Sequence, residues 1–312
     1  MLLMCRNTPV YDVDKQQVLS EKHLPGIMLK NPCNRALEYW QNTRYSSSYN
    51  MLAHQIKQKA FGSASRKHIN NYTRQLSLSD SYWFKNANEQ ITFEEVSPYF
   101  VDFWTGLGEY TNNAIPTLYV PGCLSKEWMN KDYLIKYGGN PAVENQCICL
   151  CKYCGIPVNN CSLLDNNQGI IIENFTSIDY FLEQSNQSGI LSIDNFTSED
   201  IIYNFGIQGI QMITIDAITG NGDRHSGNFG WIRSTETGEY LGMSPLYDFD
   251  HGLDSKKPKD ILINDLLKII TSHKEEQYKE EVYRVASMAM GSSINTIFNT
   301  RANVIYNMVK YL

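Results

Sequence analysis

The sequence lacks long apolar runs. Across its 312 residues no hydrophobic stretch approaches the roughly 20 residues that a membrane-spanning helix needs. The N-terminal stretch MLLMCRNTPVYDVD turns polar too soon for a secretory signal peptide. We therefore expect a cytoplasmic protein that does not associate with membranes.

A strong excess of charge is also missing. The formal net charge is −6, and charged residues make up 19% of the chain. Such mild acidity gives no reason to expect direct binding to nucleic acid. The apolar fraction of 42% is typical of a folded protein and excludes a disordered chain.

The charge is unevenly distributed along the chain. Residues 1–86 contain 12 Lys and Arg against 5 Asp and Glu, a net +7, so the remainder has 15 against 28, a net −13. This contrast predicts a domain boundary near residue 90. The basic segment contacts either an anionic partner or acidic residues of its own chain, and we favour the acidic residues of its own chain.

Disulfide bonds are not expected, because the cytoplasm keeps thiols reduced. The chain nevertheless has eight cysteines, five of them from Cys147 to Cys161, and the C-x-C-x-C-x-x-C run resembles a zinc-ligand pattern. However, a helix over Glu144–Tyr153 would place Cys147, Cys151 and Cys154 on one face, where cysteine packs as a small apolar residue. We favour packing and keep zinc as the alternative.

Residues 1–95 show no pattern typical of an activity. Two helices are predicted, around Arg35–Gln41 and Tyr49–Ala60. The aromatic segment Leu76–Phe84 is either a strand or a docking patch. We interpret these residues as an accessory segment packed on the main domain.

Short strands are predicted next. Thr117–Val120 and Tyr133–Tyr137 would form a hairpin whose loop, VPGCLSK, could lie over a ligand, although one glycine is a weak signal for a phosphate-binding loop. Lys136 stands between apolar residues of the second strand. It therefore lies either at a sheet edge or with its ammonium group turned inward, towards an anion. Ile156–Val158 and Gly169–Glu173 are further predicted strands.

The C-terminal half is predicted to be mainly helical. A short helix capped by Thr176 or Ser177 runs to Gln184, and a longer one runs from Thr197 to Gly220. Two strands and three helices follow: Phe229–Arg233, Tyr240–Met243, Ile261–Ile270, Glu276–Met290 and Ile294–Leu312. A small β-rich lobe followed by a helical lobe is a bilobal α+β architecture.

The stretch Gly220–Gly252 carries the chemistry. Asp223 and Asn228 are five residues apart, so one loop can direct both side chains into a pocket, and a hairpin returns Asp248 to it. One carboxylate and one amide are enough for Mg²⁺ when nucleotide phosphates supply the remaining ligands. A second carboxylate can orient an attacking hydroxyl, as in phosphoryl transfer. Such residues also form ordinary turns, but their combination with Lys136 favours a site.

With its motifs GNGDRHSGNFG and SPLYDFD, this stretch resembles the catalytic core of HipA-type serine/threonine kinases, near the phosphoinositide-kinase branch of the protein-kinase-like fold. That group has the catalytic loop N-x-D-R-H-x-x-N. The resemblance covers residues 115–255 and does not reach the first 90. It implies an accessory segment over 1–95, a β-rich N-lobe over 96–175 and a helical C-lobe over 176–312, with the catalytic loop at 220–252.

The resemblance assigns roles to the residues of this loop. Asp223 is similar to the catalytic aspartate that orients the acceptor hydroxyl, and Asn228 and Asp248 are similar to the Mg²⁺ ligands. His225 resembles the loop histidine near the nucleotide phosphates. The sequence D-F-D lacks the glycine of D-F-G, so Asp250 is either a second ligand or a loop cap, and we favour the cap.

Upstream residues resemble the nucleotide-binding part of the family. Lys136 is similar to the lysine that contacts the α- and β-phosphates, and Glu144 is the candidate for its helix partner. The two are only eight residues apart, closer than in eukaryotic kinases. Glu173 to Phe175 resembles the hinge whose backbone meets adenine.

By this resemblance the protein is expected to use ATP and Mg²⁺ to phosphorylate a serine or threonine hydroxyl of a protein, with autophosphorylation as an additional option. The family permits a toxin–antitoxin role with a separate, antitoxin-like DNA-binding partner. One alternative keeps the fold but changes the acceptor to a lipid or small molecule, or the transfer to adenylylation. Another is a nucleotide-binding pseudokinase that serves as an interaction module.

Overall fold

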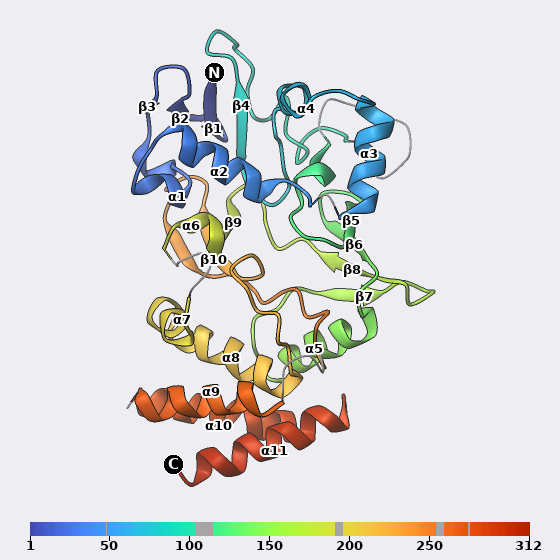
Figure 1. The fold of residues 1–312 in the computed structure, drawn as a ribbon, viewed down its shortest axis with the longest axis vertical. Coiled ribbons are helices and arrows are strands. Elements are labelled where there is room, and N and C mark those ends of the chain that lie inside the picture. The colour runs from blue at the N-terminus through green and yellow to red at the C-terminus, as the bar shows by residue number, and fades with distance from the viewer. Residues whose placement is uncertain (48, 104–114, 191–195, 254–258, 274) are drawn as a thin grey trace. The chain divides into compact units, whose positions relative to one another are not determined.

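The computed structural model describes all residues except 48, 104–114, 191–195, 254–258 and 274. The chain forms two compact units (Figure 1). The first unit comprises Met1–Gly138, Ile171–Ser192 and Gly230–Gly242, and the second comprises Gly139–Ile170, Ile193–Phe229 and Met243–Leu312. The lobe boundaries expected from the sequence, at residues 95 and 175, remain a proposal.

The first unit begins with an antiparallel sheet in the strand order β3-β2-β1-β4. Its strands are β1 (Leu2–Cys5), β2 (Thr8–Asp12), β3 (Gln17–Val18) and β4 (Tyr82–Lys85). Helices α1 (Gly26–Leu29) and α2 (Asn34–Arg44) contribute to the same hydrophobic core, where Trp40 packs edge-on against Tyr82, which packs edge-on against Phe181. The N-terminal residues therefore share one core with Phe181, a residue far from them in sequence. Of the predicted strand Leu76–Phe84, only the end is strand.

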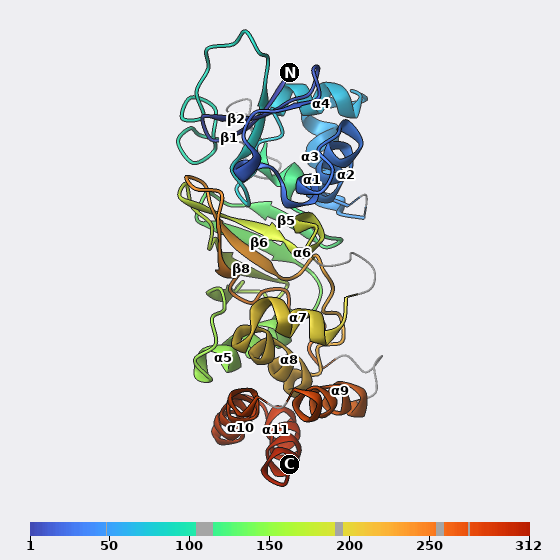
Figure 2. The ribbon, with the colours of Figure 1, turned by 90° about the vertical axis from the view of Figure 1, so that its left-hand side faces the viewer.

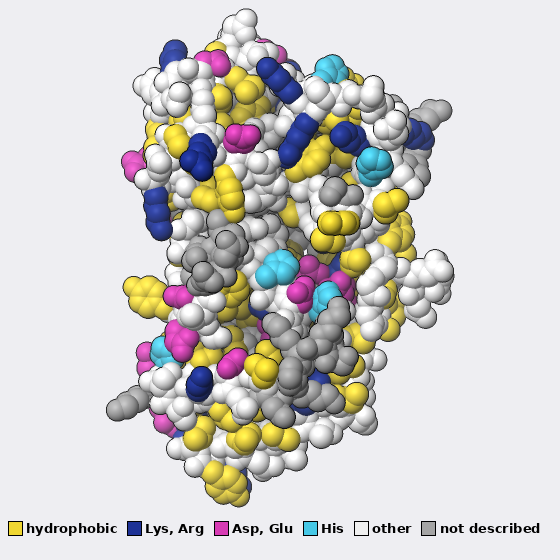
Figure 3. Space-filling model, in the orientation of Figure 1, with side chains coloured by type: hydrophobic (Ala, Val, Ile, Leu, Met, Phe, Trp, Pro, Cys, Tyr) yellow, Lys and Arg dark blue, Asp and Glu magenta, His cyan; other side chains and the backbone are white. Residues whose placement is uncertain are grey.

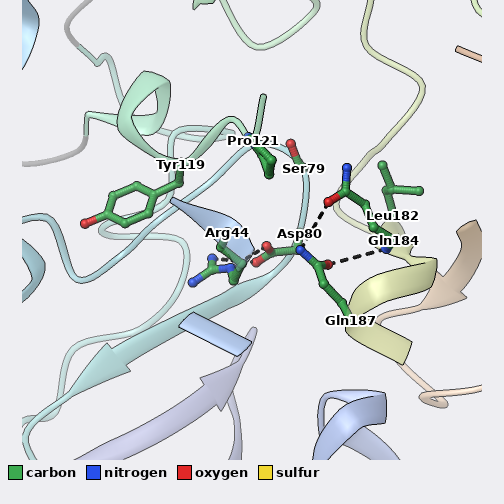
Figure 4. A pocket seen from close by; sticks show the side chains of 8 residues that line it. All are labelled: Arg44, Ser79, Asp80, Tyr119, Pro121, Leu182, Gln184 and Gln187. Atoms are coloured by element: carbon green, nitrogen blue, oxygen red, sulfur yellow. Dashed lines mark hydrogen bonds and ion pairs between the residues drawn. The ribbon is translucent and has the colours of Figure 1, made fainter. Parts of the chain in front are cut away.

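A buried ion pair joins α2 to the chain before β4. The guanidinium of Arg44 donates from Nε and Nη2 to the carboxylate of Asp80, at 2.7 and 2.8 Å, and stacks 4.6 Å from the ring of Trp40. The pair borders a cavity of about 20 Å³, which has room for roughly one water molecule (Figure 4). Nη1 of Arg44 has no hydrogen-bond partner among the described residues, so a water in this cavity would satisfy it.

Helices α3 (Met51–Phe61) and α4 (Arg66–Thr73) follow. Both begin at capped residues, because the side chain of Asn50 accepts from the amide of Ala53 and that of Ser65 accepts from the amide of His68. Both helices bury their apolar sides in a second core cluster, formed by Ala53, Ile56, Ile69, Ile115, Leu118 and Tyr119. Their other sides are exposed.

The predicted strand Thr117–Val120 is wrong. Pro116–Tyr119 forms the 3₁₀ helix η2, because the fixed φ of Pro116 favours a helical turn and its nitrogen cannot donate to a sheet. The partner of β6 (Tyr133–Tyr137) is instead β5 (Ser125–Trp128), in antiparallel register. The strand order is β5-β6-β8-β7, with β8 at Gly169–Glu173 as predicted and β7 at Cys161–Leu163. The boundary between the units falls within β8.

The short helix predicted to run from Thr176 to Gln184 is also wrong. Tyr180–Gln184 is strand β9, paired antiparallel with β10 (Gly230–Ser234) in a sheet of order β11-β10-β9. The hydroxyl of Ser177 accepts from the amides of Asp179 and Tyr180, so it stabilises a turn before the strand. Strand β11 (Tyr240–Met243) matches its prediction, and a short helix α6 (Ser185–Ser188) follows β9.

The described part of the second unit is mainly helical (Figures 1 and 2). The predicted helix from Thr197 to Gly220 is two helices, α7 (Ser198–Phe205) and α8 (Ile207–Thr219), because Gly206 adopts a φ of +54° that ends one and begins the other. The three C-terminal helices are confirmed, and α10 packs against α8 and α11. Their bounds are α9 (Lys259–Ser272), α10 (Glu276–Gly291) and α11 (Thr296–Lys310).

The cysteine-containing helix is confirmed as α5 (Pro141–Tyr153), and the packing prediction holds, since Cys147, Cys151 and Cys154 are buried.

Among the described residues, no helix combines the length and the apolar character needed to cross a membrane.

Burial predicts which thiols react. It raises the pKa of Cys147, of Cys151 and of Cys154, the last to about 11, whereas Cys123 and Cys149 are exposed. Each pKa unit lowers the thiolate fraction tenfold, so alkylation of the three buried thiols should be at least about 100-fold slower in the native protein. Peptide mass spectrometry after brief iodoacetamide treatment measures this. Rapid native labelling of Cys147 or Cys151 would contradict the packing described.

Candidate active site

The loop that carries the predicted catalytic residue begins where α8 ends. Gly220 closes the helix with a φ of +69°, a conformation that favours glycine, and a Cβ there would displace the guanidinium of Arg301. The side chain of Asn221 then donates to Asp216 of α8 at 3.0 Å and accepts from the amide of Asp223 at 3.4 Å. The start of the loop is thereby held to the helix.

Arg224 organises the loop from beneath. Its guanidinium donates from Nε and Nη2 to the carboxylate of Asp216, both at 2.9 Å, and stacks on the ring of Phe249. Its Nη1 donates to the backbone oxygens of Asn228 and Tyr247, each also at 2.9 Å. One nitrogen thus holds Asn228 and the residue before Asp248 side by side.

The charge on Arg224 is secured by its surroundings. Burial alone would lower the pKa of this guanidinium, but the carboxylate of Asp216 and, to a smaller extent, that of Asp248 raise it above the ordinary arginine value. Arg224 therefore stays protonated while buried, and it has a positioning role.

Asn228 closes the loop on itself. Its side chain is 2% exposed; Oδ1 accepts from the amide of His225 at 3.0 Å, and Nδ2 donates to the backbone oxygen of Asp223 at 2.8 Å. These two bonds hold the amide in one orientation and place it beside the backbone of the predicted catalytic residue.

The carboxylate of Asp223 points away from this scaffold. Its side chain is 53% exposed, and Oδ2 lies 3.9 Å from Nε2 of His225 and 3.7 Å from Nε2 of His251. On the face shown in Figure 3, histidine and acidic side chains lie next to one another. The sequence reasoning missed His251, although its position directly after D-F-D was a usable signal.

Asp248 has a strained backbone. Its φ is +63°, a conformation that non-glycine residues adopt mainly where the surrounding structure imposes it, often at active sites. Hydrogen bonds hold the backbone both before and after Asp248. The amide of Leu246 donates to Pro157 at 2.9 Å, and the amide of Phe249 donates to Oε1 of Glu144, a buried residue of α5. The prediction of a strand over Ile156–Val158 is wrong, because this segment forms only an isolated β-bridge, between Val158 and Leu246.

The remaining predicted residues belong to the first unit. Lys136 lies in β6, between β5 and β8, and is 2% exposed, so the inward orientation is confirmed and the sheet-edge option is wrong. Lys126 of β5 stands directly opposite in register, on the same face of the sheet. The sequence reasoning missed this second lysine. Glu173 ends β8, and Phe175 follows it.

Comparisons with known proteins identify the fold. No protein-family model matches the sequence, and no curated protein does. HipA of the Shewanella oneidensis MR-1 toxin–antitoxin system, solved with HipB and operator DNA, matches with a TM-score of 0.51 and 11% identity over 99% of this chain and 96% of that one. The protein has a HipA-like kinase fold. The match includes the N-terminal residues that the sequence motifs did not reach.

A second similar structure is the Helicobacter pylori proinflammatory kinase CtkA. It matches with a TM-score of 0.38 and 16% identity, over 60% of this chain and 89% of that one. The α+β, bilobal fold class that the sequence predicted is confirmed by the HipA match. Sequence identities this low establish the fold and do not establish the chemistry of the site.

Proposed function

We propose that this protein is a kinase that transfers the γ-phosphate of Mg·ATP to a serine or threonine hydroxyl of a protein, with its own hydroxyls as additional acceptors. One observation carries the proposal. Nη1 of Arg224 donates to the backbone oxygens of both Asn228 and Tyr247, which supports a site in which the Asn228 amide and the carboxylate of Asp248, the residue after Tyr247, act together with Asp223. This is the set of groups that phosphoryl transfer requires.

The residues present fit a magnesium ion. Oδ1 of Asn228 accepts one hydrogen bond and keeps a second lone pair, and Asp248 adds a carboxylate oxygen. Within the described residues, no three His, Cys, Asp or Glu side chains form a metal site by themselves. A magnesium ion held by Asn228 and Asp248 would therefore complete its shell with phosphate oxygens and water, as Mg²⁺ usually does. When bound, it would neutralise charge on the phosphates.

Asp223 would orient the acceptor hydroxyl and take up its proton. Its carboxylate is exposed and carries no metal duty in this scheme, so it is available to a substrate. The imidazoles of His225 and His251 lie within 4 Å of this carboxylate. We propose His225 near the nucleotide phosphates as well.

Further nucleotide contacts would come from lysines of β5 and β6, from Glu144 and from the end of β8. We propose that Lys136 binds the α- and β-phosphates with Glu144 as its partner, and that Lys126, opposite Lys136 in the same sheet, adds a second positive charge. The backbone from Glu173 to Phe175 would meet the adenine. Nζ of Lys126 donates to the backbone oxygen of Pro121 at 3.2 Å, and the place of Lys126 opposite Lys136 in register supports two positive charges at one face of the sheet.

The alternatives are distinguishable. A lipid or small-molecule kinase would use the same residues with another acceptor. An adenylyltransferase would transfer the AMP group of ATP, which contains the α-phosphate, in place of the γ-phosphate. A pseudokinase would keep the fold without turnover, but the ordered positions of Asn228 and Asp223 favour an enzyme. Because the HipA neighbour was solved with HipB and operator DNA, we further propose an antitoxin-like DNA-binding protein as a partner of this chain.

The decisive experiment is incubation of the purified protein with Mg·ATP, followed by mass spectrometry of intact protein and peptides. We expect phosphoryl groups on serine or threonine, label transferred from γ- but not α-labelled ATP, and no reaction with EDTA. Asp248→Asn should slow transfer by at least about 100-fold, because it removes the carboxylate that would hold the magnesium ion, and that ion is what would neutralise charge on the phosphates. Transfer of α-label would instead identify an adenylyltransferase, and full activity of Asp248→Asn would contradict the proposed metal site.

A further inference from the structure

The longest stretch without a carboxylate lies in the first unit. From Tyr39 to Ser79 the chain has no Asp or Glu, although these residues number 33 in the whole protein. The same stretch contains six Lys and Arg and two of the six histidines. Helices α3 and α4 both lie within it. The net acidity of the whole chain conceals this local concentration of positive charge.

Two of the six cations are neutralised inside the unit. Arg44 is buried against Asp80, and Arg74 pairs with Glu89 at 2.8 Å. The Arg74 guanidinium lowers the pKa of Glu89 to about 2, so that pair stays ionised at neutral pH. These two arginines have structural roles, and the guanidinium of Arg66 in addition stacks 4.4 Å from the centre of the Tyr45 ring.

The other cations lie on α3 and α4 and face outward. Lys59, Arg66 and Lys67 are exposed, as are His54 and His68, and Lys57 is half-buried. In Figure 3, several lysine, arginine and histidine side chains lie among hydrophobic and uncharged ones in the upper right of the view, where Figure 1 shows α3 and α4. We call the exposed sides of the two helices the α3–α4 surface.

Aromatic and amide groups accompany these charges. Tyr49, just before α3, is 77% exposed, and Tyr72 of α4 is 39% exposed while its ring packs edge-on against Phe61. Gln55, Gln58 and Asn71 are exposed beside them. To bind an acidic protein segment, this surface would need only its cations, and the exposed tyrosine rings would have no role. Exposed tyrosine rings among cations and amides are the groups that bind both the phosphates and the bases of an unpaired strand.

We propose that the α3–α4 surface binds single-stranded nucleic acid. Lys59, Arg66 and Lys67 would contact phosphates, and Tyr49 would stack on a base. The mild net charge of the chain argued against nucleic acid as a partner, but phosphates respond to the local charge, and no carboxylate of this stretch opposes them. The proposal does not depend on the kinase activity, because none of these residues belongs to the candidate active site.

The test measures fluorescence anisotropy of labelled oligo(dT) and oligo(U) with the full-length protein over a salt series. The charge-reversed variant Lys59→Glu/Lys67→Glu should bind at least about 10-fold more weakly, and its salt slope should fall by about 0.7 for each lost phosphate contact. Tyr49→Ala should weaken binding about 10-fold with little change in slope. The matched control is Lys268→Glu/Lys310→Glu, which changes the net charge equally at exposed lysines of α9 and α11.

Each outcome decides the proposal. Affinity that falls for the α3–α4 variant and not for the control supports it, and the preferred oligonucleotide distinguishes DNA from RNA. Absence of binding at low salt overturns it, as does equal weakening by the two double variants. Competition by poly-glutamate as effective as that by oligonucleotide, with Tyr49→Ala unchanged, would identify an acidic protein partner instead. Circular dichroism and thermal unfolding confirm that each variant is folded.

Discussion

Replacement of Asp223 by alanine is expected to abolish phosphate transfer while leaving the protein folded. A positioned carboxylate that accepts the hydroxyl proton contributes 10²- to 10⁴-fold, so the initial rate should fall by about 10³-fold. The side chain is 53% exposed, so its removal should leave the midpoint of thermal unfolding almost unchanged. Initial rates with γ-labelled ATP, beside a thermal melt, measure both quantities.

Two comparisons make the Asp223 result specific. Asp165→Ala removes an exposed carboxylate from the same unit and should retain full activity. Asp223→Asn keeps the shape of the side chain, so it should be nearly as inactive as Asp223→Ala if proton acceptance is the role. Normal transfer by Asp223→Ala would remove this residue from the mechanism. Loss of nucleotide binding in the same variant would indicate a role in holding ATP.

Among the proposed substitutions, replacement of Arg233 by methionine is expected to cause the largest loss of stability. Its guanidinium, 2% exposed, lies 3.2 Å from Oε2 of Glu183 and donates at 2.7 Å to the backbone oxygens of Lys22, Leu24 and Gly238. Arg233 thus ties the N-terminal residues to the hairpin of β10 and β11. Removing one partner of a buried ion pair strands the other charge, which costs about 3–5 kcal/mol in free energy of unfolding.

The dependence on pH distinguishes this cause from a loss of packing. Burial raises the pKa of Glu183, and Arg233 is the group that most opposes the shift, so the pKa rises further in the variant. When a carboxyl group has a higher pKa in the folded than in the unfolded state, the folded protein becomes more stable relative to the unfolded chain as the pH falls. The deficit of Arg233→Met, measured by urea unfolding, should therefore shrink in mildly acidic buffer.

A double variant completes this test. Glu183→Gln/Arg233→Met removes both charges and should recover part of the lost stability, because no buried ion is left without a partner. A deficit that is equal at both pH values and is not relieved in the double variant would show that the hydrogen bonds to the backbone, and not the charge, are what Arg233 contributes.

Helices were predictable where local signals agree. Asn140 and Pro141 begin α5, and the periodicity of the three C-terminal helices is strong enough to identify them. Predictions failed where pairing at long range decided the structure. Tyr180–Gln184 carries a helix-cap signal before it, yet it pairs with Gly230–Ser234, nearly fifty residues away in sequence. No local pattern contains that partner.

The candidate site shows the same division. The spacing of Asp223, Asn228 and Asp248 within two motifs selected them as candidates, because one loop and one returning segment can bring them together, and their joint role remains a prediction. Lys126 and His251 escaped notice. Each becomes significant through a neighbour that the sequence does not indicate, Lys136 across a sheet register and Asp223 across a loop.

The sequence by itself determined the residue types of the candidate loop, the helical C-terminal region and the basic character of the N-terminal segment, since these depend on composition and short-range spacing. Only the tertiary structure decided that Arg224 serves the loop as a buried anchor, that Lys136 turns inward and that the cations of α3 and α4 lie outward. The physical reason is that burial and pairing are properties of neighbours in space, and most of those neighbours are distant in the chain.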